Sequence, residues 1–225
     1  MYLIKKILFH KFYQSRKPYG HSMPAFISDM QLHIDEIISE WSKFKNEKMV
    51  MGIPIDEVSV EQKSLNEDKK WKAVFIYGYN YFTPIGNEYF PVTTLLIKKW
   101  KKEITLAFFS ILESGKHIPP HMGNNHSVIR TQIGIDISCP EKTCLRIMDK
   151  TIQLKNKEII VFDDTFEHEA WNTDSLPRIV LIVDSRKKMS TFYDILNRVW
   201  MKKVENSIYV QNAIRNIKNQ SFYLW

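Results

Sequence analysis

Apolar residues recur along this chain with two different periods, one typical of helices and one typical of strands. Residues 27–46 place Ile34, Ile37, Ile38 and Trp41 on one stripe, which predicts an amphipathic helix. Residues 92–102 and 189–203 repeat the helical spacing, and residues 204–225 predict a second helix or an arm. Short apolar runs broken by turn residues predict strands at 71–82, 104–112, 128–137, 144–148, 158–162, 168–172 and 178–184.

The order of these elements favours one core with helical additions. Short strands without long helices between them are typical of a sandwich or jelly roll, so we expect a mainly β core with flanking helices (α+β). Residues 1–70 are expected to form a helical and loop extension packed on the core, 71–187 the core itself, and 188–225 a C-terminal helical extension. Residues 47–70 are polar and predict a surface segment or substrate-facing loop. A hairpin turn through 173–177 is expected to pair 168–172 with 178–184.

The net charge of +7 is concentrated at the two ends of the 225-residue chain. Residues 1–28 hold five basic and no acidic side chains, and residues 186–225 hold eight basic and two acidic ones, which leaves the middle slightly negative. This distribution argues against a nucleic-acid groove through the core, although basic ends can contact phosphates or anionic lipid. Residues 2–13 have amphipathic spacing, which favours a short helix docked on the domain; the alternative is an anchor on an anionic membrane.

Several classes of protein are disfavoured by what the sequence lacks. It has no apolar run long enough to span a bilayer, and its N-terminus is a poor signal peptide. Cys139 and Cys144 make neither a disulfide scaffold nor a strong zinc motif, so a reducing, cytoplasmic setting is expected. P-loop, Rossmann and nucleophile-elbow motifs are missing from the sequence. His117 and His126 are expected to lie in loops.

Two segments concentrate the residues that could carry chemistry. His121 precedes Arg130 by nine residues, and His168 precedes Arg178 by ten. Two neutral imidazoles can bind a divalent transition metal, and two guanidinium groups can bind the two ends of a dicarboxylate. The alternative is that each arginine pairs with a structural carboxylate such as Asp163, Asp164 or Asp184, since an unpaired buried charge is costly.

Four motifs in the same order and spacing resemble a known family. They are FFSILESGKHIPPHMG, IRTQIG, IIVFDDTFEHEAWN and RIVLIVD, within residues 71–184. Together they resemble the aspartyl/asparaginyl β-hydroxylase family. The resemblance implies a double-stranded β-helix (a jelly-roll or cupin-like core) and an oxygenase that uses Fe(II), 2-oxoglutarate and O2.

The resemblance also implies a role for each residue of the motifs. His121 and His168 are the expected iron ligands, and Gly123 stands where related oxygenases carry a carboxylate ligand. Arg178 and Ser110 are expected to bind the distal carboxylate of 2-oxoglutarate, and Arg130 its C1 carboxylate. Gln132 replaces a histidine that the family usually has beside the C1 carboxylate, which predicts weaker cosubstrate binding because Gln cannot become cationic.

The expected reaction is hydroxylation of an unactivated C–H bond. Gly123 favours the β-carbon of an Asp- or Asn-type substrate, whereas the basic, apolar N-terminus favours a lipid; the alternatives are a lipid A acyl-chain hydroxylase and a non-catalytic jelly-roll binding module. The partners expected are 2-oxoglutarate and a small-molecule, peptide or lipid substrate, with no nucleic acid and with membrane contact, if any, through residues 1–13. The oligomeric state stays open.

Overall fold

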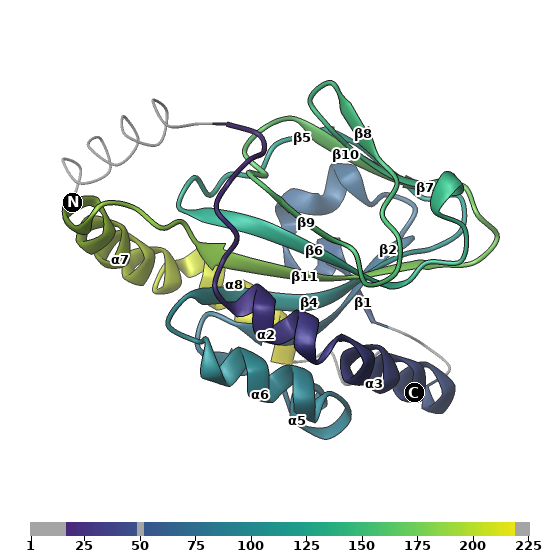
Figure 1. The fold of residues 1–225 in the computed structure, drawn as a ribbon, viewed down its shortest axis with the longest axis horizontal. Coiled ribbons are helices and arrows are strands. Elements are labelled where there is room, and N and C mark those ends of the chain that lie inside the picture. The colour runs from purple at the N-terminus through teal and green to yellow at the C-terminus, as the bar shows by residue number, and fades with distance from the viewer. Residues whose placement is uncertain (1–16, 49–51, 219–225) are drawn as a thin grey trace.

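The computed structural model describes residues 17–48 and 52–218. Two antiparallel sheets face each other (Figure 1). The larger sheet has the strand order β1 (Ile53–Pro54), β2 (Trp71–Gly78), β4 (Ile104–Leu112), β11 (Arg178–Arg186), β6 (Val128–Asp136) and β9 (Ile159–Phe162), with β3 (Tyr81–Phe82) paired to β2. The smaller sheet has the order β5 (His117–His121), β10 (His168–Asn172), β7 (Thr143–Ile147) and β8 (Lys150–Ile152).

The strand order identifies the topology of the core. The strands from β4 to β11 pair in a nested order. In the larger sheet β4 pairs with β11 and β6 with β9, and in the smaller sheet β5 pairs with β10 and β7 with β8. This nested pairing of eight antiparallel strands across two sheets is the jelly roll, or double-stranded β-helix. The predicted fold class is confirmed, including the helices that flank the β core.

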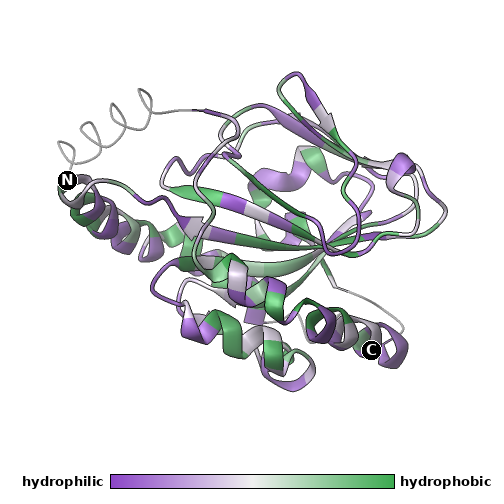
Figure 2. Cartoon of the chain, viewed as in Figure 1, coloured by the Kyte–Doolittle hydropathy of each residue, from purple (hydrophilic) through white to green (hydrophobic). Residues whose placement is uncertain are grey.

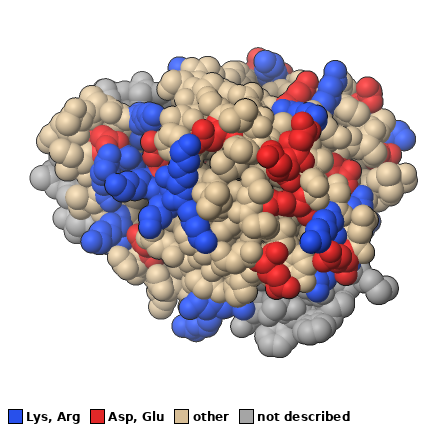
Figure 3. Space-filling model, turned by 60° about the horizontal axis from the view of Figure 1, so that its bottom comes forward, with Lys and Arg blue, Asp and Glu red and all other residues tan. Residues whose placement is uncertain are grey.

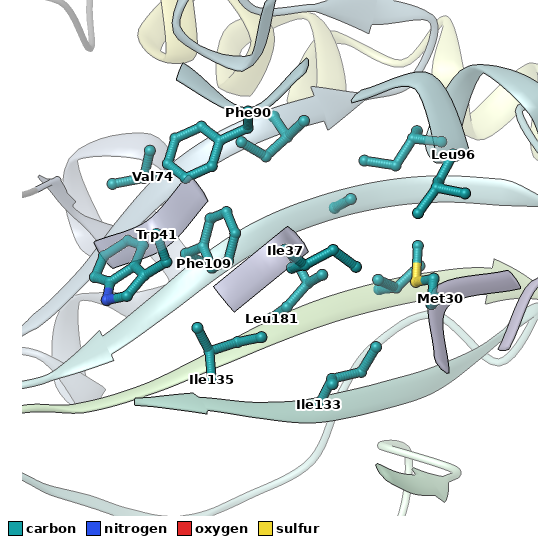
Figure 4. Packing of buried hydrophobic residues seen from close by; sticks show 14 of the residues in the cluster. Met30, Ile37, Trp41, Val74, Phe90, Leu96, Phe109, Ile133, Ile135 and Leu181 are labelled. Carbon is teal, nitrogen blue, oxygen red and sulfur yellow. The ribbon is translucent and has the colours of Figure 1, made fainter. Parts of the chain in front are cut away.

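Both faces of the larger sheet are covered. Its outer face packs against helices α2 (Phe26–Leu32), α3 (Ile34–Glu47), α5 (Pro84–Tyr89) and α6 (Pro91–Lys99), where Trp41 and Phe90 meet Phe109 of β4 (Figure 4). Alternate residues of the same strands, such as Phe108 and Val180, point to a second core between the two sheets. Because β11 is buried on both faces, its sequence is apolar almost throughout, as the hydropathy colouring indicates (Figure 2).

Two predictions about the secondary structure and its pairing need correction. The helix predicted for 27–46 is interrupted at His33 and forms α2 and α3. The hairpin predicted through 173–177 is wrong, because β10 pairs with β5 and β7 whereas β11 pairs with β4 and β6. The connection instead crosses from one sheet to the other. The buried Asn172 amide holds this crossing by donating to the carbonyl oxygens of Leu112 (2.9 Å) and Leu176 (2.8 Å).

The segment predicted to be a surface segment or a substrate-facing loop is partly buried. Residues 53–65 form β1, the short helix α4 (Ile55–Val58) and a 3₁₀ helix (Val60–Leu65). Ile53, Ile55 and Val58 are buried in the core between the sheets. At the other end of the chain, α7 (Thr191–Glu205) and α8 (Ile208–Lys218) follow β11, and α8 packs against α4. The amphipathic segment 2–13 lies outside the described residues. Among the helices that the structure describes, none is long and apolar enough to cross a membrane.

Candidate functional site

His121 and His168 lie directly opposite each other on the adjacent strands β5 and β10. Their ring centroids are 4.2 Å apart. In each ring, Nδ1 is held by a backbone carbonyl oxygen two residues earlier, that of Pro119 at 2.8 Å and that of Phe166 at 2.9 Å. If each Nδ1 carries the proton that it donates to this carbonyl, both Nε2 atoms keep a free lone pair, which is the arrangement that orients histidine ligands of metals.

Both imidazoles are held in the neutral form. Burial lowers the pKa of His121 below its usual value. Burial, followed by the proximity of His121, lowers the pKa of His168 to about 3. Neutral imidazole is the form that binds a transition metal, so the pair is prepared for a divalent cation over the whole neutral pH range.

Arg130 is fully paired with carboxylates. It lies opposite Asp184 in the register of β6 and β11, and its Nε and Nη2 donate to the two Asp184 oxygens at 2.8 and 2.7 Å. Its Nη1 is 3.2 Å from Asp164 Oδ2. The sequence left two possibilities for each arginine, binding of a dicarboxylate ligand or pairing with a carboxylate of the protein. Arg130 follows the second, because it pairs with Asp184 and Asp164.

Arg178 has the opposite environment. It is 2% exposed, and burial lowers the pKa of its guanidinium to about 10. Its Nη2 donates to Gln132 Oε1 at 3.1 Å, its Nε has no hydrogen-bond partner, and no carboxylate pairs with it among the described residues. A buried guanidinium without a counter-ion is unfavourable, so this position would gain most from an anionic ligand.

Ser110 and Gln132 both lie at the Arg178 end of the inner face. Ser110 is opposite Val180, two residues from Arg178 along β11, and its hydroxyl accepts a hydrogen bond from Trp71 Nε1 at 3.0 Å. Gln132 lies two residues from Arg130 on the inner face of β6, and its side chain contacts Arg178. Its expected place beside the C1 carboxylate of 2-oxoglutarate stays a prediction.

Asp164 fills the space beside Gly123. A Cβ atom on Gly123 would lie 2.5 Å from the Asp164 Cγ, so a larger residue at position 123 would displace this carboxyl group. Burial raises the pKa of Asp164 to about 6, and its Oδ1 has no hydrogen-bond partner among the described residues. The sequence suggested Asp164 only as a structural partner; the signal for more was an acidic pair shortly before His168, together with a glycine two residues after His121.

The two histidines open into a largely apolar cavity of about 380 Å³. Its walls come from the inner face of the larger sheet, from the segment 55–65 and from α8. The apolar lining residues are Ile55, Val58, Leu65, Trp71, Phe75, Leu106, Phe108, Met122, Val128, Val210, Ala213, Ile214 and Ile217. Among the described residues, its charged lining residues are Glu61, Arg130, Asp164 and Asp184, and the arginine is already paired with two of these carboxylates.

The protein donors available for a metal are few. Among the described residues, no group of three or more His, Cys, Asp and Glu side chains is arranged to hold a metal ion. A metal bound by the two Nε2 atoms would therefore keep several positions for water or other ligands. His117, expected in a loop, lies at the start of β5, where its Nε2 is 2.7 Å from Glu169.

Comparison with known proteins places this arrangement among hydroxylases. The sequence model of the family described as aspartyl/asparaginyl beta-hydroxylase matches residues 33–188. The chain is 29% identical over 170 residues to an ornithine lipid ester-linked acyl 2-hydroxylase of Rhizobium tropici, covering 74% of this chain and 60% of that protein. It is 27% identical over 129 residues to the aspartyl/asparaginyl beta-hydroxylase of Mus musculus, covering 55% of this chain and 17% of that protein. The chain thus spans less than two thirds of each of these relatives.

Solved structures with a similar course of the chain include cupin domains. One belongs to an XRE family transcriptional regulator of Enterobacter cloacae, with 12% identity, a TM-score of 0.37, and coverage of 53% of this chain and 99% of that one. Another is an HTH_3 family transcriptional regulator of Vibrio cholerae, with 10% identity, a TM-score of 0.38, and coverage of 57% and 60%. The assignment of the jelly roll rests on the strand order described above.

Proposed function

Since this chain belongs to the aspartyl/asparaginyl β-hydroxylase family, we propose that it is an Fe(II)- and 2-oxoglutarate-dependent dioxygenase that hydroxylates an unactivated C–H bond. The observation that carries the proposal is a pair of neutral imidazoles with free Nε2 atoms, together with a buried guanidinium that has no carboxylate partner among the described residues. The first feature suits a divalent metal and the second suits an organic acid. A binding module that recognises a small acid could use the guanidinium, but it would not need the pair of imidazoles.

The iron would be held by His121 and His168. Their Nδ1–H groups are fixed by backbone carbonyl oxygens, which sets the tautomer and the direction of both rings before a metal arrives. When bound, iron with 2-oxoglutarate supplies the oxidising chemistry that side chains lack. The part played by the protein is to bind and orient the reactants and to exclude water from an apolar cavity.

Arg178 would bind one carboxylate of 2-oxoglutarate, with Ser110 beside it. Gln132 accepts a hydrogen bond from Arg178 Nη2 and thereby holds the guanidinium in place. The Nε of Arg178 is a buried donor without a partner among the described residues, and Arg178 lies outside the lining of the apolar cavity, so an anionic ligand would have to reach beyond that lining to contact it. Arg130, the residue expected at the C1 carboxylate, would have to share its donors with Asp184 and Asp164. We therefore assign Arg130 first to ordering these two carboxylates.

Asp164 would act on water beside the metal. Its Oδ1 has no protein partner in the described part of the chain, and its other oxygen is anchored by Arg130. A carboxyl group with a pKa near 6 can either accept or donate a hydrogen bond at neutral pH. Its place beside Gly123 suits the orientation of a water molecule on the side of the pocket where related oxygenases carry a carboxylate ligand.

The cavity favours an acyl chain as the substrate. A free cation would favour an aspartyl substrate, but the cation that the described residues contribute to the lining is Arg130, and it is paired with two carboxylates. Glu61 in the same lining would repel a carboxylate further. An aliphatic chain instead gains about 0.8 kcal/mol for each methylene removed from water by such walls. The name of the relative from Rhizobium tropici, an ornithine lipid ester-linked acyl 2-hydroxylase, agrees with this substrate class.

A succinate-release assay with Fe(II) tests the reaction and the substrate together. Lipids with long acyl chains are expected to stimulate succinate release, and peptides with Asp or Asn are expected to leave it at the background rate. Under anaerobic conditions, Fe(II) with 2-oxoglutarate should give the visible charge-transfer band of chelated iron. A folded protein without this band would exclude the oxygenase and favour the binding module.

Variants of α8 test the acyl-chain assignment separately. Ala213 lines the cavity, whereas its neighbour Asn212 is exposed. Ala213→Trp should fill the cavity and reduce lipid-stimulated succinate release while leaving the charge-transfer band intact, and Asn212→Trp should change neither. Stimulation by an Asp peptide that survives Ala213→Trp would support the second candidate, β-hydroxylation of an Asp or Asn residue. Gly123 and the mouse and human relatives favour that candidate.

A further inference from the structure

Helix α7 carries an apolar stripe that faces solvent. Phe192, Ile195 and Val199 are 61%, 57% and 45% exposed, although all three are large apolar residues. Their spacing of three and four residues puts them on one face of the helix. The opposite face of α7 packs on the protein through the buried residues Asn197 and Met201. The stripe is therefore a second apolar face, which the packing of α7 on the core does not use.

Lysine residues border this stripe. At about 100° per residue, Lys202 and Lys203 lie on its two edges. A cavity of about 580 Å³ beside α7 is lined by Lys101, Lys102, Lys202 and Arg198. In the part of the chain that the structure describes, no ion pair with a carboxylate is formed by Lys101, Lys102, Lys202 or Lys203. Figure 3 shows basic side chains gathered on the left of the molecule, the side on which Figure 1 places α7.

The same surface adjoins the candidate site. Tyr79 and Thr105 line both the basic cavity and the apolar cavity that contains the two histidines. Helix α8 follows α7 after a two-residue link, and its residues Val210 and Ile214 form part of the wall of the apolar cavity. The exposed stripe on α7 and the part of the cavity wall on α8 thus belong to two consecutive helices.

We propose that α7 and the basic cavity beside it dock on an anionic lipid bilayer. The stripe would enter the boundary between headgroups and acyl chains, and the unpaired lysines would contact the phosphates. This combination fits a lipid surface better than a nucleic acid, which offers phosphates but no partner for a continuous apolar stripe. Docking in this orientation brings the protein to its acyl substrate at the edge of the site. The surface differs from the one that the sequence suggested, residues 1–13, which lie outside the described residues.

Vesicle co-sedimentation of the full-length chain tests the proposal without iron or cosubstrate, so its result does not depend on the proposed activity. The wild-type chain should pellet with phosphatidylcholine–phosphatidylglycerol vesicles, stay in solution with phosphatidylcholine alone, and be released by salt. Ile195→Glu should lower the partition coefficient about tenfold or more, because it places a charge in the stripe. The double variant Lys101→Gln/Lys202→Gln should lower it about fivefold for each charge removed.

Matched variants separate this surface from others. Leu32→Glu changes an apolar residue of α2 that is 78% exposed, and Lys43→Gln removes a lysine of α3 whose side chain is 73% exposed; both should bind as wild type. The proposal is overturned if the wild-type chain ignores anionic vesicles, or if Ile195→Glu binds like Leu32→Glu. It is also overturned if binding depends on Lys5 and Lys6 and not on α7. A dimer that Ile195→Glu converts to a monomer would overturn it as well, because the stripe would then cover a second copy of the chain.

Discussion

Replacing Arg178 by Met distinguishes a ligand-binding arginine from a structural one. The guanidinium is fully buried, and the lowering of its pKa from 12.5 to about 10 corresponds to about 3 kcal/mol of unfavourable burial of the charge. Its one side-chain hydrogen bond, to Gln132, returns about 1.5–3 kcal/mol. These two contributions nearly cancel. Arg178→Met should therefore change the free energy of unfolding of the ligand-free protein by less than about 2 kcal/mol.

The affinity for 2-oxoglutarate should change much more. Loss of a charge-assisted contact worth about 1.5–3 kcal/mol raises the Kd about 10- to 150-fold. The Kd is measured by anaerobic titration of the charge-transfer band, and the stability by urea unfolding of the same preparations. Arg130→Met is the matched control, because it leaves Asp164 and Asp184 buried without a counter-ion and should cost about 3–5 kcal/mol.

The two arginine variants can refute the reasoning cleanly. If Arg178→Met unfolds the protein as severely as Arg130→Met and leaves the Kd for 2-oxoglutarate unchanged, then Arg178 is a structural residue. The dicarboxylate site would in that case have to lie elsewhere in the molecule. If both variants lose 2-oxoglutarate affinity while Arg130→Met stays stable, Arg130 binds the cosubstrate and its carboxylate pairs are secondary.

Three further outcomes are expected. His168→Ala should abolish Fe(II) binding, measured by calorimetry, with an unchanged far-ultraviolet spectrum; retained binding would remove His168 from the metal site. Gly123→Ala should lower stability by about 1–3 kcal/mol and reduce succinate release, because the new Cβ meets Asp164 at 2.5 Å; unaltered urea unfolding would show that Asp164 moves freely. In the metal-free protein, His168 should lower the free energy of unfolding as the pH falls below 6.5, because its pKa is lowered to about 3 and only the unfolded chain binds this proton. The contribution of His168 to the slope is at most about 1.4 kcal/mol per pH unit, and the slope should shrink by this amount in His168→Gln.

The sequence predicted the strands better than their pairing. Alternating and continuous apolar runs mark β4, β6 and β11 because these strands are buried on both faces. Pairing was harder, because a short loop such as 173–177 is equally compatible with a hairpin and with a crossing between sheets. What decides between them is the buried amide of Asn172, whose partners Leu112 and Leu176 become known only once the sheets are stacked.

The candidate site, too, was predictable from the sequence only in part. The residue types and the family resemblance identified His121 and His168, which the register of β5 and β10 places side by side. Neither source of information could tell which of the two arginines pairs with carboxylates of the protein. Both arginines lie in apolar strands, but they differ in the residue that faces them on the neighbouring strand. Arg130 lies opposite Asp184, and Arg178 lies opposite Leu112. Because of these cross-strand partners, Arg130 forms an ion pair, whereas Arg178 has no carboxylate partner among the described residues.

The apolar cavity beside the histidines could be predicted from the sequence least well. Its walls join three segments that are remote in the chain: residues 55–65, the inner face of the larger sheet, and α8. Ile55 and Val58 stand within a polar stretch, so the periodicity of that stretch gave no reason to expect them inside. The jelly roll supplies the two histidines of the candidate site, and the additions at both ends of the chain supply apolar walls. In a family whose relatives include hydroxylases of acyl chains and of aspartyl and asparaginyl residues, these additions are where the choice of substrate should be encoded. Exchanging α8 should then alter the substrate while leaving the binding of iron and 2-oxoglutarate unchanged.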